Sequence, residues 1–417
     1  MGENAVLRAR MVDLGLKQDE LARQMNDALL AITGRPGEVS ARTVRNLISG
    51  ATTRPIGRTC VALERVFQCP VTELGFASTA TAAPPEDHVL RRSFHGLTAS
   101  VLLSPLSGSG ARRTVGMSDV LRLRDGMVAL TALDQSRGGH SALEKAALAG
   151  AAEAVGMQQN AASQTVRQRL LSLGAHYTAS AAWSCIDARQ LDRARSHLAE
   201  ALRMAGMAQD PVAQLRVWNA SAMLAHQRHE YGEGIAASHA AQATTAARRD
   251  PMLSSLAHAR TAIGHASCGD GKPALRSLGY AEVALAKADP TTPRPPWIGF
   301  YGRAELAALT AIVHELLGAP ADAEAASHRA LASLPEELRR NRSMTMVRLA
   351  VAQLRQGEVE QACATTGSAF DLMAGDPLPG RLRTMLGDFH RNLFTVAPSA
   401  QVAREWADRY RTEWRTA

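Results

Sequence analysis

The stretch VSARTVRNLISG, residues 39–50, has the pattern of a short helix that begins at Ser40 and ends at Gly50. Serine favours the position before a helix, and glycine favours the position just after one. The apolar residues fall on one side: Val39, Val44 and Leu47. The polar residues fall on the other: Arg42, Arg45 and Asn46. Such a helix could read DNA bases, or it could be one more helix of a repeat protein.

The segments on either side predict a small helical unit around this stretch. Residues 4–15, NAVLRARMVDLG, and 17–32, KQDELARQMNDALLAI, both place apolar residues at helical spacing. A fourth helix is expected over residues 57–67, with a short closing helix after it. The connection TGRPGEV, 33–39, is longer than the usual turn between two such helices, so we expect a departure from the standard arrangement there.

Charge also distinguishes this region. The chain of 417 residues has a formal net charge of +8, which permits an anionic partner without requiring one. Between Glu38 and Glu64 there is no carboxylate, and the same window holds four arginines: Arg42, Arg45, Arg54 and Arg58. This one-sided window favours the DNA-reading interpretation of the helix.

Three segments, GLKQDELARQM, VSARTVRNLISG and ALERVFQCPVTELGF, together resemble a Cro/CI-type (XRE) helix-turn-helix domain across residues 4–76. This segment is similar to the N-terminal domains of actinobacterial XRE regulators that carry C-terminal tetratricopeptide (TPR) repeats, and the resemblance covers most of the chain. In the resemblance, Val39, Thr43, Val44 and Leu47 stand where the recognition helix turns inward, and Gln18 opens the second helix.

The resemblance implies which residues would contact DNA. Ala41, Arg42 and Asn46 would face base edges, and Arg45 would reach a base or a phosphate. Gln18 would meet phosphate at the start of its helix, and Arg54 and Arg58 suit phosphate better than bases. The full predicted set is Lys17, Gln18, Ser40, Ala41, Arg42, Thr43, Arg45, Asn46, Arg54 and Arg58.

From residue 164 onward, small residues recur at fixed spacing. The anchors lie 40, 40, 49 and 39 residues apart: Ala194, Gly234, Ala274, Ala323 and Ala362. Seven residues after each anchor stand Ala201, Ala241, Ala281, Ala330 and Ala369. Twelve before each stand Ala182, Ala222, Ala262, Ala311 and Ala350. A large apolar residue follows each of these last five: Trp183, Met223, Ile263, Ile312 and Val351.

This pattern predicts units of two antiparallel helices, in which small residues let the backbones approach and the large residue fills the gap between units. The spacing resembles that of TPR repeats, although the units are longer and lack the usual aromatic late in the first helix. The longest interval contains DPTTPRPPWIGFY, 289–301, whose prolines exclude an α-helix through 290–296. We expect this loop to seal the stack of helices, with a ligand contact through Trp297 as the alternative.

Other kinds of chemistry find little support in the sequence. The five cysteines form no C-x-x-C pair, and no phosphate-binding or nucleophile motif occurs, so we expect no enzyme, metal or cofactor. His226 and His229 share a helical segment but lack a third ligand. Residues 90–111 look like a twin-arginine export signal but begin far from the amino terminus. We therefore expect a cytoplasmic protein without a membrane span.

The expected fold class is all-α. It comprises a DNA-binding domain at 1–76, a linker with an interdomain helix at 77–116, and a TPR-like α-solenoid for sensing and dimerisation at 117–417. The leading hypothesis is a homodimeric transcriptional regulator of double-stranded DNA that responds to a peptide or small molecule. The repeat register suggests ligand contacts at His176, Arg216, Asn219, Arg260, Arg348 and Trp297. The alternative is a scaffold whose repeats hold a protein partner while the basic head tethers it to DNA.

Overall fold

The computed structural model describes residues 4–33, 37–53, 55, 57–67, 69, 71–76, 115–137, 140–374 and 380–416. Throughout these residues the regular structure is helical, with no strand, so the predicted all-α class is confirmed. The chain divides into two compact units. Unit 1 comprises Met1–Arg122 and Asn160–Val166, and unit 2 comprises Leu123–Gln159 and Arg167–Ala417. The predicted linker and the export-like segment at 90–111 fall almost wholly outside the described residues.

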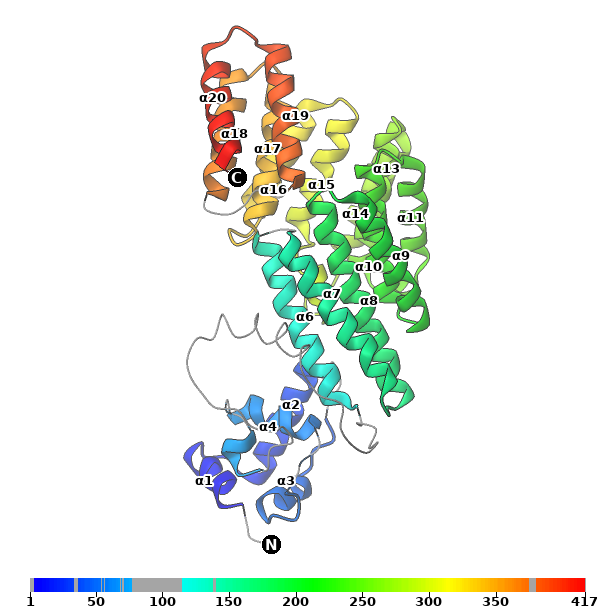
Figure 1. Ribbon diagram of the computed structural model, residues 1–417, viewed down its shortest axis with the longest axis vertical. Helices are drawn as coiled ribbons and strands as arrows, with labels where there is room; N and C mark the ends of the chain where they lie inside the picture. Colours follow the sequence, from blue (N-terminus) through cyan, green and yellow to red (C-terminus); the bar gives the residue numbers. More distant parts are fainter. Residues whose placement is uncertain are drawn as a thin grey trace, which may run out of the picture. The chain divides into compact units, whose positions relative to one another are not determined.

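The described residues before position 77 in unit 1 form the following helices (Figure 1): α1 (Ala5–Asp13), α2 (Gln18–Thr33), α3 (Ala41–Ile48), α4 (Gly57–Phe67) and the 3-10 helix η1 (Val71–Leu74). Helix α2 packs against both α3 and α4. The core between them is formed by fully buried side chains: Leu7, Leu21, Met25, Val44, Leu47, Leu63 and Leu74. The predicted helical segments therefore exist, but the expected apolar face of α1 is buried only in part: Leu7 and Met11 are buried, whereas Val6 and Leu14 are 46% and 55% exposed.

Asn4 ties the ends of three of these elements together. Its side-chain oxygen accepts a hydrogen bond from the Leu7 amide, which caps α1. Its backbone amide donates to the Ile48 carbonyl at the end of α3, and its Nδ2 donates to the Leu74 carbonyl of η1. Gly75 passes so close that a Cβ there would lie 2.6 Å from the Asn4 side-chain oxygen. This network fixes the end of α3 within unit 1.

Unit 2 continues with helices joined mainly by short turns. Its elements, two of which begin in unit 1, are α6 (Met117–Arg137), α7 (Ser141–Gly156), η2 (Met157–Gln159), α8 (Gln164–Asp187), α9 (Leu191–Met207), α10 (Pro211–Gln227), α11 (Tyr231–Ala243), α12 (Thr245–Arg249), α13 (Pro251–Ser267), α14 (Gly271–Ala286), η3 (Pro296–Ile298), α15 (Arg303–Leu316), α16 (Pro320–Ser333), α17 (Arg339–Arg355), α18 (Val359–Met373), α19 (Gly380–Val396) and α20 (Gln401–Thr416). Consecutive helices pair as hairpins, such as α10 with α11 and α13 with α14 (Figure 1). Neighbouring pairs also contact each other, as α11 does with α13 and α16 with α17.

All fifteen small residues of the predicted repeat are buried. They lie at the contacts between paired helices, where a larger side chain would hold the backbones apart. The large residues beside them differ from the expectation. Trp183, Met223, Ile263 and Ile312 line an internal cavity of unit 2 instead of only filling gaps between units, and Val351 alone is not part of that lining.

The proline-rich segment at 289–301 forms an ordered connection within unit 2. Arg294 makes two hydrogen bonds with the Asp250 carboxylate at 2.6 and 2.9 Å, and η3 follows directly. Trp297, Ile298 and Tyr301 are buried in the core formed mainly by α13 and α15. The Tyr301 hydroxyl lies 2.7 Å from the Ser255 hydroxyl. These side chains are therefore part of the core of unit 2, and Trp297 also lines the cavity described below.

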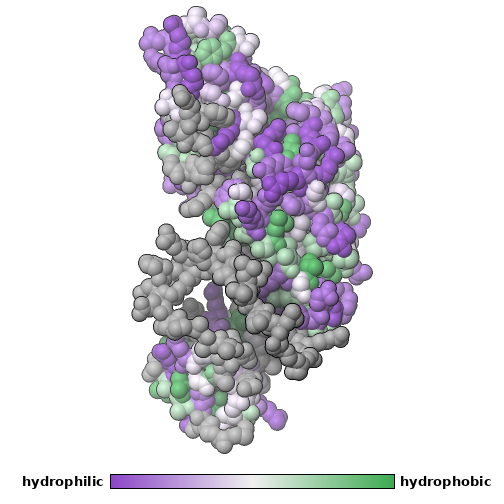
Figure 2. Space-filling model, in the orientation of Figure 1, coloured by the Kyte–Doolittle hydropathy of each residue, from purple (hydrophilic) through white to green (hydrophobic). Residues whose placement is uncertain are grey.

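None of the described helices combines the length and apolar character needed to cross a membrane. Figure 2 shows hydrophilic side chains distributed over the face of unit 2 that it presents, interspersed with hydrophobic ones.

Candidate functional site

Helix α3 has well-defined ends. Ser40 precedes it with extended backbone, and its hydroxyl accepts a hydrogen bond from the Thr43 amide at 3.3 Å. The Thr43 hydroxyl accepts from the Ser40 amide at 3.4 Å, which completes a capping box. Gly50 adopts a φ of 72°, the left-handed conformation that favours glycine after a helix end. Ser40 and Thr43 thus use their hydroxyl groups to hold the helix, so any contact they make with DNA would come in addition to that role.

The two faces of α3 differ as the sequence pattern predicts. Val44 and Leu47 are buried against α2, together with Ile48, which the sequence analysis did not include. Val39 packs partly against the same core. The other face carries the exposed side chains of Arg42, Arg45 and Asn46. Ala41 is half-buried at the first turn. The exposed face therefore offers two guanidinium groups and one amide to a partner.

The connection before α3 is held by a contact that the sequence did not reveal. The Asn26 amide group, on α2, donates to the Val39 carbonyl and accepts from the Val39 amide, both at 2.9 Å. Gly37 lies beside it, where an added Cβ would meet Leu29 and the Asn26 oxygen at 2.5 Å. The two hydrogen bonds fix the position of α3 relative to α2 despite the longer connection.

The remaining predicted DNA contacts surround α3 within unit 1. Arg58 is exposed in the first turn of α4, Lys17 is exposed just before α2, and Gln18 is half-buried as its first residue. Arg54 lies outside the described residues. Asp19 and Glu20 follow Gln18 in the first turn of α2, and their negative charges would repel an anion at that end of the helix. A phosphate contact through Gln18 would therefore depend on its side chain more than on the helix dipole.

A second candidate site is a cavity of about 120 Å³ inside unit 2. Its wall is formed mainly by the first helices of successive hairpins, including α8, α10, α13, α15 and α17. Five of the predicted ligand-contact residues line it: Arg216, Asn219, Arg260, Trp297 and Arg348. The residues predicted from the repeat spacing thus come from separate elements and line the same cavity.

His176 is the exception among the predicted ligand residues. It is not part of the lining and lies behind Arg216, whose Nη1 donates to the His176 carbonyl at 2.9 Å. Its Nε2 is 3.9 Å from the Asp210 carboxylate. Burial, with a further contribution from the Arg216 charge, lowers the pKa of His176 to about 4. The prediction is corrected: His176 supports Arg216 from outside the cavity.

A buried ionic cluster, which the sequence pattern does not predict, lies beside the same wall. Asp187, at the end of α8, is fully buried and lies 2.5 Å from Arg340 of α17 and 3.3 Å from Arg381 of α19. Arg340 is also 3.4 Å from Asp134 of α6. The cluster joins helices that are far apart in sequence. Although burial acts against its charge, the two aspartates raise the pKa of Arg340 above its ordinary value.

His226 is a histidine on the cavity wall. Its Nδ1 lies 3.2 Å from the Ser267 hydroxyl. Burial lowers its pKa to about 4, and the positive charges of Arg348 and Arg260 act in the same direction. His229, its suggested companion, lies 2.8 Å from the Tyr231 hydroxyl instead. The ring of His226 is therefore neutral at pH 7 and adds no positive charge to the cavity.

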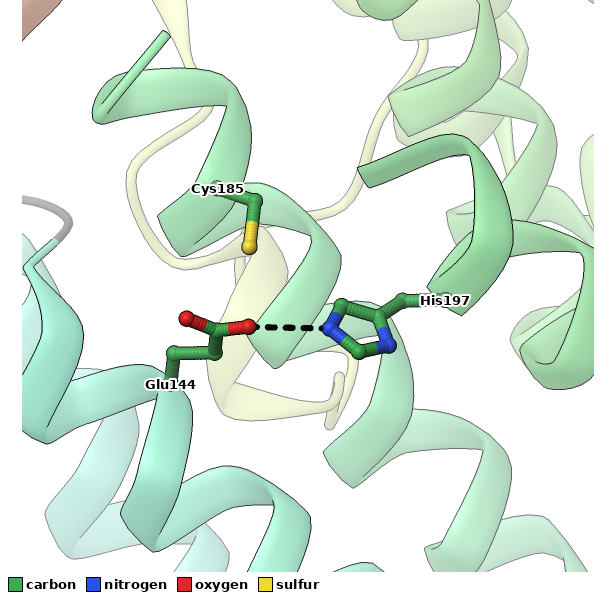
Figure 3. Close-up of side chains that lie close together, drawn as sticks. All are labelled: Glu144, Cys185 and His197. Carbon is green, nitrogen blue, oxygen red and sulfur yellow. Dashed lines mark hydrogen bonds and ion pairs between the residues drawn. The ribbon is translucent and has the colours of Figure 1, made fainter. Parts of the chain in front are cut away.

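A third cluster brings together Glu144 of α7, Cys185 of α8 and His197 of α9, whose side chains converge (Figure 3). Their possible ligand atoms lie within 4.8 Å of one another. Burial, followed by the hydrogen bond and charge of Glu144, raises the pKa of the Cys185 thiol to about 12. Arg193 also pairs with Glu144 at 2.6 Å. His197 Nε2 also lies 3.0 Å from the Glu144 carboxylate, so the cluster forms a hydrogen-bonded link between these helices.

No protein-family model and no curated protein sequence matches the chain.

Proposed function

We propose that this chain is a sequence-specific DNA-binding transcriptional regulator, in which α3 reads bases and unit 2 senses a small-molecule or peptide effector. The observation that carries the proposal is the exposed face of α3, with Arg42, Arg45 and Asn46 on a capped helix in a window without carboxylates. An α-helix fits the major groove of DNA, where arginine pairs with guanine and asparagine with adenine. The cytoplasm is the compartment in which such a protein would act.

The surroundings of α3 support this proposal. Its buried face, its capping box and the clamp from Asn26 hold the helix rigidly, as an element that must match base edges requires. Exposed Arg58 would contact phosphate, which positions a protein on DNA without reading sequence. Because α3 has only eight residues, one copy would read few base pairs. We therefore propose a homodimer that binds two half-sites.

The test is selection of bound duplexes from a random DNA library by the full chain, followed by affinity measurement on the enriched sequence. Arg42→Ala should lower affinity for that sequence by about 1–3 kcal/mol and relax preference at one base position. Arg203→Ala is the matched control, because Arg203 is an exposed arginine of unit 2 that pairs with Glu200. Selection that enriches no sequence would refute the proposal.

One observation favours a second candidate, the protein-interaction scaffold. Helix α14 exposes three large apolar side chains, Leu275, Tyr280 and Val283, with exposed fractions of 48%, 55% and 55%. Exposed apolar groups that cluster on one element are typical of protein-binding surfaces. A scaffold would bind DNA without sequence preference, so the same library selection separates the two candidates.

A further inference from the structure

The cavity of unit 2 contains two arginines, Arg260 buried and Arg216 half-buried, that form no ion pair. Arg216 donates to the His176 carbonyl at 2.9 Å and to the Ser180 hydroxyl at 2.7 Å. Arg260, which is only 5% exposed, donates from Nε to the Asn219 oxygen at 2.9 Å. Neither guanidinium forms an ion pair with any described carboxylate. The hydrogen-bond partners of both cations are therefore neutral groups, although the charge of Asp134 acts on Arg216 and that of Glu305 acts on Arg260.

The other three arginines of the wall differ in this respect. Arg340 and Arg381 share Asp187, and Arg348 lies 3.0 Å from Glu315. Arg340 also lies 3.4 Å from Asp134. Among the described residues that line the cavity, five arginines face two carboxylates, Asp134 and Glu305, so positive charge outnumbers negative charge there. Arg216 and Arg260 are the two of these arginines that form no ion pair.

Such an arrangement is costly in a protein without a ligand. Burial lowers the pKa of both Arg216 and Arg260 to about 10, which reflects the penalty on the charged form. Buried charges in proteins are normally paired or bound to a ligand. In addition, Nη1 of Arg260 and Nε1 of Trp297 are buried donors with no hydrogen-bond partner among the described residues. Both residues line the same cavity.

The two arginines lie close enough to serve one ligand. Arg216 and Asn219 are three residues apart on α10 and therefore share a face of that helix. Arg260 reaches Asn219 from α13. The Arg216 guanidinium also lies 5.6 Å from the centre of the Trp297 ring. One anionic group near Asn219 would therefore have both cations and the indole beside it.

The rest of the wall is apolar and aromatic. Trp183 lies under the Arg381 guanidinium at 5.8 Å. The other large apolar side chains of the lining include Met223, Ile263, Phe300, Leu309, Ile312 and Met344. Aromatic and branched side chains of this kind surround flat, apolar ligand bodies, while a few polar groups fix their orientation.

We propose that the cavity binds an organic carboxylate with a flat, apolar ring body, whose carboxylate lies between Arg216 and Arg260. The role of this organic carboxylate as an effector rests on the proposed function, whereas its binding to the cavity does not. The same chemistry occurs in a free aromatic acid and in a peptide with a C-terminal phenylalanine carboxylate. The shared requirement is one negative charge attached to a ring.

The test compares acids with their uncharged amides by calorimetric titration of the full chain. The free-acid probes are 2-naphthoate and 2-naphthamide, and the peptide probes are Gly-Gly-Gly-Phe with a free or an amidated C-terminus. Hydrogen bonds to charged groups predict that one acid binds about 10- to 100-fold more tightly than its amide. The acid that binds more tightly shows whether the ligand is a free aromatic acid or a peptide with a C-terminal phenylalanine. Equal affinity of both acids and their amides, or no binding of either acid at millimolar concentration, would overturn the proposal.

Variants separate a binding role from a structural one. Arg260→Met should abolish the preference for the acid while the thermal midpoint stays equal or rises, because an unpaired buried charge is removed. Arg260→Lys should recover part of the preference, and Arg203→Met on the exposed surface should leave it intact. If Arg260→Met fails to fold, Arg216→Met tests the same preference. If the variant that folds still prefers the acid, the assignment is contradicted. If neither variant folds, the assignment is also contradicted, because these arginines then have a structural role.

Failure of this site and failure of the proposed function give different results. The titrations contain no DNA, so a chain that selects no DNA sequence can still prefer the acid. That outcome would refute the proposed regulatory function and would still support the proposed anion site. Sequence-specific DNA binding without any preference for the acid would refute the anion site alone.

Discussion

Replacement of Asp187 by asparagine tests how the buried ionic cluster holds unit 2 together. Asp187 is fully buried, and its carboxylate faces Arg340 at 2.5 Å and Arg381 at 3.3 Å. Asparagine has nearly the same shape, so no cavity forms and the change removes the negative charge alone. Arg381 would keep no carboxylate in contact among the described residues, whereas Arg340 would keep Asp134 at 3.4 Å.

The expected cost follows from the charge that remains. Removing one partner of a buried ion pair destabilises a protein by about 3–5 kcal/mol, and the retained Asp134 contact places Asp187→Asn near the lower end. At about 2–4 °C per kcal/mol for a domain of this size, the thermal midpoint should fall by roughly 10 °C. The measurement is thermal and denaturant-induced unfolding followed by circular dichroism.

A matched control distinguishes burial from pairing. Asp192 pairs with Arg228 at 2.6 Å, a similar distance, but its side chain is 92% exposed. Asp192→Asn should therefore change stability by less than about 1 kcal/mol. Adding Arg381→Met to Asp187→Asn leaves Arg340 facing Asp134 and should restore most of the loss. Equal small effects of the two asparagine variants, or no recovery in the double variant, would refute this reasoning.

Three further predictions concern other described contacts. Asn26→Ala should lower the stability of unit 1 by about 1–3 kcal/mol in denaturation experiments, because both hydrogen bonds to Val39 are lost. It should also weaken DNA binding in a gel-shift assay, and an unchanged DNA affinity would argue against a positioning role for Asn26. His176 and His226 have folded pKa values near 4, so the unfolded chain binds more protons between about pH 6.5 and 4. Stability should fall as pH decreases through that window, by up to about 3 kcal/mol for each ring, and less steeply in His226→Gln. Burial acts to raise the pKa of Glu144, but contacts with His197, Cys185 and Arg193 outweigh it, so the pKa lies below its ordinary value of 4.5. The ionised Glu144 therefore stabilises the fold above pH 4.5, and this stabilisation is lost as the pH falls below that value. Glu144→Gln should thus cost about 1–3 kcal/mol at pH 7 and remove part of the acid-induced loss, which unfolding at pH 7 and pH 3 would measure.

Local signals predicted the elements of unit 1 well. Ser40 and Gly50 bound α3 as expected, because capping and left-handed glycine depend on neighbouring residues alone. Repeat spacing likewise predicted buried small residues, because a close approach of two helices excludes larger side chains at those positions. Burial of the opposite face of α3 follows from the helical period in the same way. These features require no knowledge of distant contacts.

Other features depend on contacts that sequence spacing cannot determine. Asp187 and Arg340 are 153 residues apart, and nothing in either segment indicates that they meet. His176 has a suitable register but turns toward Asp210, which helical period alone does not resolve. The Asn26 clamp joins a side chain to the backbone at Val39, so no pairing of residue types reveals it. The cavity itself was predicted only as a set of residues, without its excess of positive charge.

The most direct test of the central claim is the affinity of the full chain for its selected DNA sequence and for a scrambled duplex, measured across salt concentrations. Arg42→Ala should lose about 5- to 150-fold in affinity for the selected sequence and little for the scrambled one. Arg203→Ala should match the unaltered chain on both duplexes. Equal losses on both duplexes, or no loss on the selected one, would contradict a base-reading role for α3.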